Sequence, residues 1–164
     1  MTATVTQTFA ASTTAAITSL NSLAAATMSS SSNTVAQSVS ISNSGGARDA
    51  LIQIGFSTTT TGTLTNGKAV YVFAYGTENT VLGSPATGSD TTLSIPNPYG
   101  LKMVGFVPVS ALSTAYVSQP LSIAAAFNGI LPRSWGVIVV NDTGLSLSTA
   151  GSTFSYSLVT DTIT

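Results

Sequence analysis

Apolar and polar residues alternate along much of the chain after residue 34, which is the pattern of β-strands that bury one face. From Val35 to Ile41 every second residue falls on one face, and alanine or serine occupies the positions between. The turn-forming run Asn43-Ser-Gly-Gly46 follows, and alternation resumes from Ala50 to Phe56. These stretches predict two strands separated by a turn.

The remaining apolar runs are also short and are separated by proline and glycine turns. Further strands are predicted at Lys68–Tyr75, Thr91–Ile95, Leu101–Val109, Ala115–Ser118, Leu121–Phe127, Trp135–Asn141 and Thr153–Thr160. A short helix at residues 122–127 is the alternative for the fifth of these. Many short strands with closely spaced turns are typical of an antiparallel sandwich or barrel. We therefore expect an all-β fold, an antiparallel β-sandwich of jelly-roll-like type with an extended N-terminal section.

Residues 1–34 are rich in Ser, Thr and Ala, and large apolar residues are sparse there. The sizeable apolar anchors are Val5, Phe9, Ile17, Leu20 and Leu23. Alternation at residues 4–9 predicts a strand, whereas the spacing of three at residues 17–23 allows a helical turn or extended backbone. The section is interpreted either as the first strands of a domain at residues 35–164 or as an arm that orders on a partner. On the arm hypothesis, deleting residues 2–30 leaves a folded domain.

The stretch GTLTNGKA, from Gly62 to Ala69, has the spacing of a phosphate-binding P-loop. A working P-loop opens a helix and carries Ser or Thr after its lysine, but Lys68 is followed by Ala69 and by the strand-like run AVYVFAY. Asn66-Gly67 is instead a strong signal for a two-residue β-hairpin turn. The sequence thus predicts a hairpin here and no nucleotide site.

The chain lacks most of the residue types that commonly act in catalysis. The 164-residue chain contains no histidine and no cysteine, so the commonest general base and the imidazole and thiolate metal ligands are missing. The five carboxylates are Asp49, Glu78, Asp90, Asp142 and Asp161. Each has a turn-like or terminal setting without a nearby acidic partner, so we interpret them as solvated loop acids. We expect no enzyme activity, no cofactor and no metal.

Charge is unusually scarce, at 5% of residues with a formal net charge of −1. A folded chain of this mass exposes roughly 7,500 Å², so each charge has about 800 Å² to itself, about what one partner buries in an ordinary interface. Such a surface suits permanent contact with other subunits. The four basic residues, Arg48, Lys68, Lys102 and Arg133, are too few and scattered to follow a phosphate backbone, so we expect no nucleic-acid binding.

Three local features have ordinary explanations. The first twenty residues contain no Lys or Arg and no continuous apolar core, which predicts neither a secretory signal nor a membrane anchor, and so assembly in the cytoplasm. Trp135 beside Arg133 could stack on a sugar, but it opens the run WGVIVV, which favours a core position. The triplet Asn141-Asp-Thr143 matches a glycosylation acceptor by coincidence.

Four stretches together resemble small virion structural proteins of tailed bacteriophages, over most of residues 35–160. They are RDALIQI at Arg48–Ile54, GKAVYVFAYG at Gly67–Gly76, ATGSD at Ala86–Asp90 and SIAAAFNGILPRSWGVIVVN at Ser122–Asn141. The resemblance implies a non-enzymatic β-rich particle component, most like a capsid decoration (cement) protein on the virion surface that bridges major capsid subunits. The N-terminal section is poorer in charge than this resemblance implies.

The resemblance implies two partners, the major capsid protein and further copies of the chain, as a homotrimer or otherwise a dimer. Neither nucleic acid nor membrane is expected as a partner. The residues expected to make assembly contacts are Val5, Phe9, Ile17, Leu20, Leu23 and Arg133. A tail, neck or fibre-base component and a carbohydrate-binding β-sandwich module are the alternatives.

Overall fold

The computed structural model describes residues 4–26, 33–65, 68–78, 81–82, 86–89, 91–93 and 101–163. Strands make up most of this part of the chain. They are β1 (Val5–Phe9), β2 (Thr13–Ala15), β3 (Asn33–Gln37), β4 (Ile41–Ser42), β5 (Asp49–Ser57), β6 (Ala69–Glu78), β7 (Val81–Leu82), β8 (Thr91–Leu93), β9 (Leu101–Pro108), β10 (Ala115–Val117), β11 (Leu121–Ser122), β12 (Ser134–Asn141) and β13 (Thr153–Ile163). The helical elements are the 3₁₀ turn η1 (Thr18–Leu20) and the short helix α1 (Ile123–Ala126).

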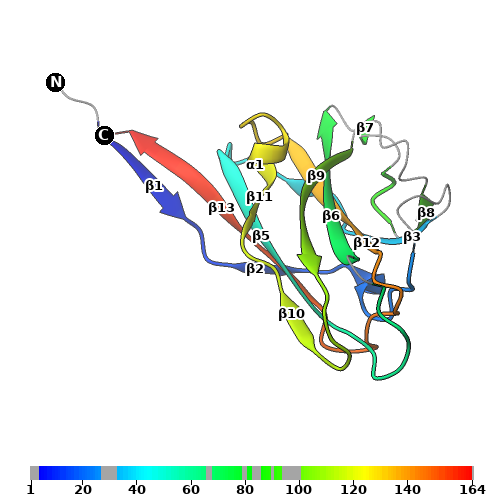
Figure 1. Ribbon diagram of the computed structural model, residues 1–164. Coiled ribbons are helices and arrows are strands. Elements are labelled where there is room, and N and C mark those ends of the chain that lie inside the picture. The colour runs from blue at the N-terminus through cyan, green and yellow to red at the C-terminus, as the bar shows by residue number, and fades with distance from the viewer. Residues whose placement is uncertain are drawn as a thin grey trace.

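The strands form two antiparallel sheets that pack face to face, which confirms the predicted all-β sandwich (Figure 1). One sheet has the order β1-β13-β5-β10, with β2 beside β13 and β11 beside β5. The other has the order β7-β6-β12-β3-β8, with β9 beside β6 and β4 beside β12. Each sheet therefore joins strands that lie far apart in the sequence, such as β5 with β13 and β6 with β12.

The main core lies between the sheets and is built from the predicted alternating positions. On β5 the residues Ala50, Ile52, Ile54 and Phe56 are buried. Between them Leu51 is half-buried, Gln53 is exposed and Gly55 is buried. Trp135 is fully buried, which confirms its predicted core position. A smaller apolar cluster, which includes Tyr75 and Ile138, covers the other face of the second sheet. Because β12 is buried on both faces, it reads as a continuous apolar run.

The first predicted strand, at residues 35–42, is interrupted by a bulge. Ile138 pairs with Gln37, and Trp135 pairs with Ile41, so three residues at 38–40 oppose two on β12. Ser38 fills the gap, because its hydroxyl accepts the Val137 N–H at 2.9 Å. Val39 is 63% exposed. The extra residue places Ile41 in the main core with Ala36, whereas Val35 belongs to the cluster on the other face of the sheet, so the predicted shared face of Val35 and Ile41 is wrong.

The predicted hairpin at residues 62–69 is wrong. Asn66 and Gly67 lie outside the described residues, and the Lys68 N–H bonds to the Thr65 carbonyl across that position. Residues 59–65 form no strand, however, and β5 and β6 belong to different sheets. The segment between β5 and β6 therefore crosses from one sheet to the other. After Lys68 the chain forms β6, which confirms the strand predicted there in place of the helix that a P-loop would open.

Two further strand predictions are refined. Residues 121–127 contain a strand followed by a helix, the two alternatives predicted for this segment. β11 ends at Ser122 and α1 begins at Ile123. The Ser122 hydroxyl caps α1 by accepting the Ala125 N–H at 3.0 Å. Of the strand predicted at Thr91–Ile95, residues 91–93 form β8 and the rest lies outside the described residues.

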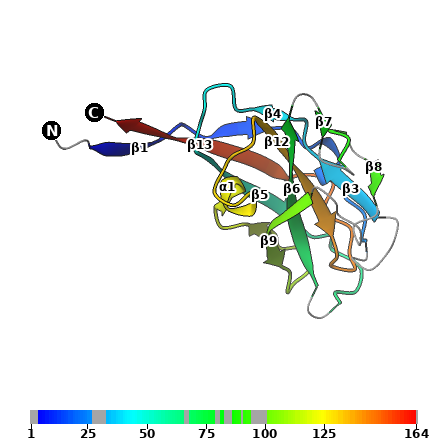
Figure 2. The same cartoon turned by 90° about the horizontal axis from the view of Figure 1, so that it is seen from above.

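The two ends of the described chain form a two-stranded ribbon. β1 pairs with the last residues of β13, from Phe9 opposite Val159 to Val5 opposite Ile163. β5 pairs with β13 only up to Val159, so the ribbon continues beyond the sandwich. Figures 1 and 2 show it extending away from the body of the molecule, with both chain ends at its tip.

Candidate assembly surface

The exposed large apolar side chains are distributed over several parts of the surface. In the part of the chain that the structure describes, they are Val5, Phe9, Val39, Met103, Phe106, Leu112, Val117, Ile130 and Ile163. Three of them, with exposures of 58–72%, belong to the ribbon of β1 and β13. The ribbon therefore leaves its own large apolar residues exposed at both of its strands.

One face of the ribbon carries these apolar residues. Two residues paired across an antiparallel ladder point to the same face of the sheet, and successive residues along each strand point to opposite faces. Val5, Gln7 and Phe9 therefore share a face, together with their partners Ile163, Asp161 and Val159. The opposite face carries the threonines Thr6, Thr8, Thr160 and Thr162.

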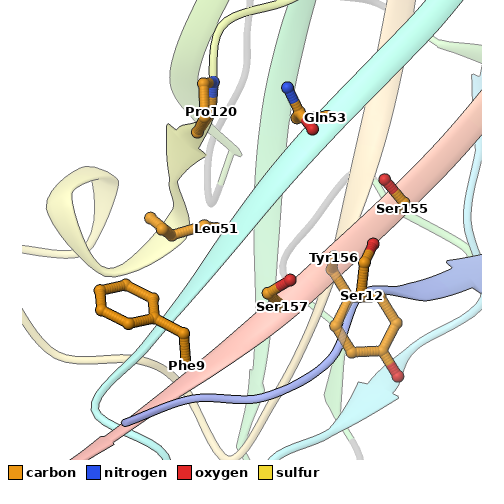
Figure 3. A pocket seen from close by; sticks show the side chains of 8 residues that line it. All are labelled: Phe9, Ser12, Leu51, Gln53, Pro120, Ser155, Tyr156 and Ser157. Carbon is orange, nitrogen blue, oxygen red and sulfur yellow. The ribbon is translucent and has the colours of Figure 1, made fainter. Parts of the chain in front are cut away.

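A shallow hollow of about 150 Å³ lies where the ribbon joins the sandwich. Its lining residues come from the base of β1, the outer positions of β5 and β13, and nearby loops: Phe9, Ser12, Leu51, Gln53, Pro120, Ser155, Tyr156 and Ser157. Figure 3 shows the apolar side chains of Phe9, Leu51 and Pro120 along one side of it. With hydroxyls, an amide and apolar groups but no charge, the hollow suits a neutral side chain of a neighbouring protein.

Most of the described charged side chains form ion pairs or hydrogen bonds with other residues of the chain. Arg48 and Asp161 form an ion pair at 3.1 Å, and Lys68 pairs with Asp142 at 3.3 Å. Among the described side chains, this leaves Lys102 and Arg133 as the exposed cations without an ion-pair partner. The Lys68–Asp142 pair is largely withdrawn from solvent, whereas the Arg48–Asp161 pair stays at the surface with its two charges opposed.

The interpretation of the carboxylates as solvated loop acids is wrong for two of them. Asp49 lies at the start of β5, where its carboxylate accepts the Ser122 hydroxyl at 2.7 Å and the Ala124 N–H at 2.8 Å. Asp142 is only 4% exposed and holds Lys68. Both therefore fix loops to the sandwich. Among the described residues, no three acidic side chains cluster as metal ligands would.

Asn141 makes a structural contact that the sequence did not reveal. Its buried side-chain amide donates to the carbonyls of Leu23, at 3.0 Å, and Leu145, at 2.5 Å. Its oxygen accepts the Thr143 hydroxyl at 2.7 Å. The triplet that matches a glycosylation acceptor thus ties the N-terminal section to β12, and Asn141 is fully buried.

The phenol of Tyr116 is the group that most resembles a reactive site. Its oxygen accepts the backbone N–H groups of Ser110, at 3.0 Å, and Ala111, at 2.8 Å. Burial raises the pKa of Tyr116, but these hydrogen bonds outweigh it and lower the pKa below 10.0. Since the donors are already occupied by the phenol oxygen, they hold the loop before β10 in place.

The structure separates the residues expected to make assembly contacts into two groups. Val5 and Phe9 are exposed on the ribbon, and Arg133 is exposed in the loop before β12, away from the lining of the hollow. Ile17, Leu20 and Leu23 are instead buried in the main core, at 7%, 2% and 2% exposure. In this conformation those three support the fold and present no contact surface. Alternation identifies Val5 and Phe9, but pattern alone could not distinguish the buried anchors from the exposed ones.

Comparisons with known proteins give no assignment, because no protein-family model and no curated protein sequence matches the chain. None of the helices in the described part of the chain is long and apolar enough to cross a membrane.

Proposed function

We propose that this protein is a non-enzymatic structural subunit of a virion, most like a capsid decoration protein that bridges major capsid subunits. The supporting observation is a surface of 8300 Å² that exposes large apolar side chains while most described charges are paired internally. With nine charged residues in the chain, roughly 900 Å² of surface belongs to each, so a patch of ordinary interface size contains about one charge. Such a surface loses little charge hydration when neighbouring subunits cover it.

The choice of a virion, and of the capsid surface within it, rests on the resemblance of residues 35–160 to phage virion proteins. A tail, neck or fibre-base position is the alternative within the same class. The carbohydrate-binding alternative loses its proposed platform, since Trp135 is fully buried and cannot stack on a sugar.

Copy number in purified particles tests the proposal. An antibody raised against the whole chain is used for gold labelling and for quantitative blotting of intact virions from a phage that encodes it. A decoration protein labels the head and is present in hundreds of copies per particle. A dozen or fewer copies at the neck or tail supports the alternative position, and absence from purified virions overturns the proposal.

A further inference from the structure

The outer edge of β1 differs from the edges formed by β9 and β10. β9 also lies at an edge, but it carries Lys102 and Pro108 and its pairing with β6 contains a bulge. β10 is only three residues long. Charges, prolines, bulges and short length are the devices by which edge strands avoid pairing with other chains. β1 has five residues, VTQTF, with none of these devices.

The main-chain groups that β1 leaves free can be identified from its register. The Ala10 N–H bonds to the Leu158 carbonyl, and hydrogen-bonded pairs recur at every second residue of an antiparallel ladder. Thr8 and Thr6 therefore bond to β13. The N–H and C=O groups of Val5, Gln7 and Phe9 point the other way, and all five residues of β1 are exposed.

The side chains of β1 are symmetric about Gln7. The order is apolar, Thr, Gln, Thr, apolar, so an antiparallel partner with the same sequence places Val5 opposite Phe9, Thr6 opposite Thr8 and Gln7 opposite Gln7. Aromatic residues pair favourably with β-branched ones across strands, and two glutamine amides can bond to each other. β1 has no charged residue, and Asp161 beside it on β13 is paired with Arg48, so two copies approach with little like-charge repulsion.

We propose that β1 is a homotypic docking strand, which pairs antiparallel with β1 of a second copy about a two-fold axis at Gln7. The pairing joins the two ribbons into a continuous sheet, β13-β1-β1-β13, through about six main-chain hydrogen bonds. The apolar residues of both ribbons then gather on one face. The inference deepens the proposed assembly role by naming a self-contact, and it does not depend on which particle the subunit joins.

A single cysteine tests this geometry directly, because the chain contains none of its own. In the proposed dimer Gln7 faces its own copy as a hydrogen-bonded pair, with Cα atoms about 5.5 Å apart, which is within the range that a disulfide spans. In Gln7→Cys, mild oxidation should therefore give a covalent dimer on non-reducing gels. The matched control is Thr8→Cys. In the proposed dimer, residue 8 lies on the other face of the sheet from residue 7 and opposite Thr6 of the second copy, so two Thr8→Cys side chains do not face each other. This variant should cross-link at least about tenfold more slowly. Equal rates for the two variants, or no dimer in Gln7→Cys, overturn the proposal.

Proline at the same position gives a second, independent test. The Gln7 N–H points away from β13, so Gln7→Pro removes an outward donor and leaves the pairing with β13 in place. Sedimentation of the full chain should show a concentration-dependent dimer that weakens at least about tenfold in Gln7→Pro and persists in Gln7→Ala. An unchanged circular dichroism spectrum and melting temperature show that each variant folds. Association that is unaffected by Gln7→Pro overturns the β1 contact, whereas a dimer that never occurs on virions overturns only the proposed function.

Discussion

At the scale of single residues, the interior of the second sheet depends on close approaches that only glycine permits. Gly136 on β12 lies directly against the ring and hydroxyl of Tyr75, which is fully buried. The Tyr75 hydroxyl in turn donates to the Ser38 carbonyl at 2.6 Å, at the bulge of residues 38–40. One glycine thus allows a buried tyrosine to satisfy the backbone where the ladder is interrupted.

Gly136→Ala should therefore be strongly destabilising. An added Cβ would overlap the Tyr75 ring, and overpacking of this kind costs about 1–3 kcal/mol or more. Gly45→Ala is the matched control, since nothing lies within 4 Å of a Cβ there, and its effect should stay within about 0.5 kcal/mol. Urea unfolding of both variants measures the difference. Equal free energies of unfolding would show that Tyr75 can move aside.

Tyr75 also predicts a loss of stability in alkali. Burial raises its pKa above 10.0, with a smaller opposing effect from the side chain of Ser38. Since an unfolded tyrosine ionises near pH 10 and folded Tyr75 stays neutral to higher pH, this contribution is complete below pH 10 and falls as the pH rises further. Tyr75→Phe should flatten that fall, and it should itself cost about 1–3 kcal/mol by leaving the Ser38 carbonyl without its donor. Unfolding free energies between pH 8 and about 11 compare the two slopes. Parallel curves would contradict the assignment.

At the scale of elements, residues 5–23 contain two structures with different roles. β1 pairs with β13 and is exposed throughout, whereas η1 and its flanking residues place Ile17, Leu20 and Leu23 in the core. The carbonyl of Leu23 is also the acceptor of the buried Asn141 amide. The boundary between a peripheral and an integral segment therefore falls between β1 and η1, well before residue 34.

Deletions should locate this boundary. Removing residues 2–10 should leave a cooperative thermal transition within a few degrees of that of the full chain, because β1 buries little. Leu23→Ala should instead lower the free energy of unfolding by about 2–5 kcal/mol, since it opens a cavity in the core. Val5→Ala, at a residue 60% exposed, is the control and should have almost no effect. Deleting residues 2–30 should consequently prevent stable folding, contrary to the arm hypothesis. A well-folded product of that deletion would restore the hypothesis.

The sequence predicts where the strands lie better than it predicts which strands pair with one another. The sequence identifies β5 and β12 because burial determines their residue patterns. A strand buried on one face, such as β5, alternates apolar and polar residues, and a strand buried on both faces, such as β12, is a continuous apolar run. The Asn66-Gly67 signal reports only local backbone preference, so it could not reveal that the strands on either side enter different sheets. The exposure of Phe9 and the burial of Leu20 likewise depend on what packs against each residue, which the spacing of anchors does not record.

At the scale of the whole molecule, the described surface offers few unpaired charges to a proposed interface with other subunits. Arg48 and Lys68 are already paired, and the exposed cations Lys102 and Arg133 lie outside the ribbon and the hollow. The proposed association would then depend on apolar burial and on neutral hydrogen bonds, neither of which ionic screening weakens.

Raising the salt concentration from about 0.05 M to 1 M should therefore leave self-association almost unchanged, because screening acts on charge pairs. Sedimentation of the full chain across this range measures it, and retention on purified virions after a salt wash gives a parallel reading. Weakening by tenfold or more in either experiment would show that charged contacts carry the interface.

The ribbon has a mechanical consequence. Val5 and Ile163 sit opposite each other at its tip, so tension that pulls these two ends apart acts across the ladder and separates one pair of residues at a time. Such unzipping requires much less force than sliding two whole strands past one another. A load applied through the chain ends would thus peel β1 from β13 first, and the sandwich would stay intact while the freed ends lengthened. The ribbon would act as an extensible tether that yields before the body of the subunit does.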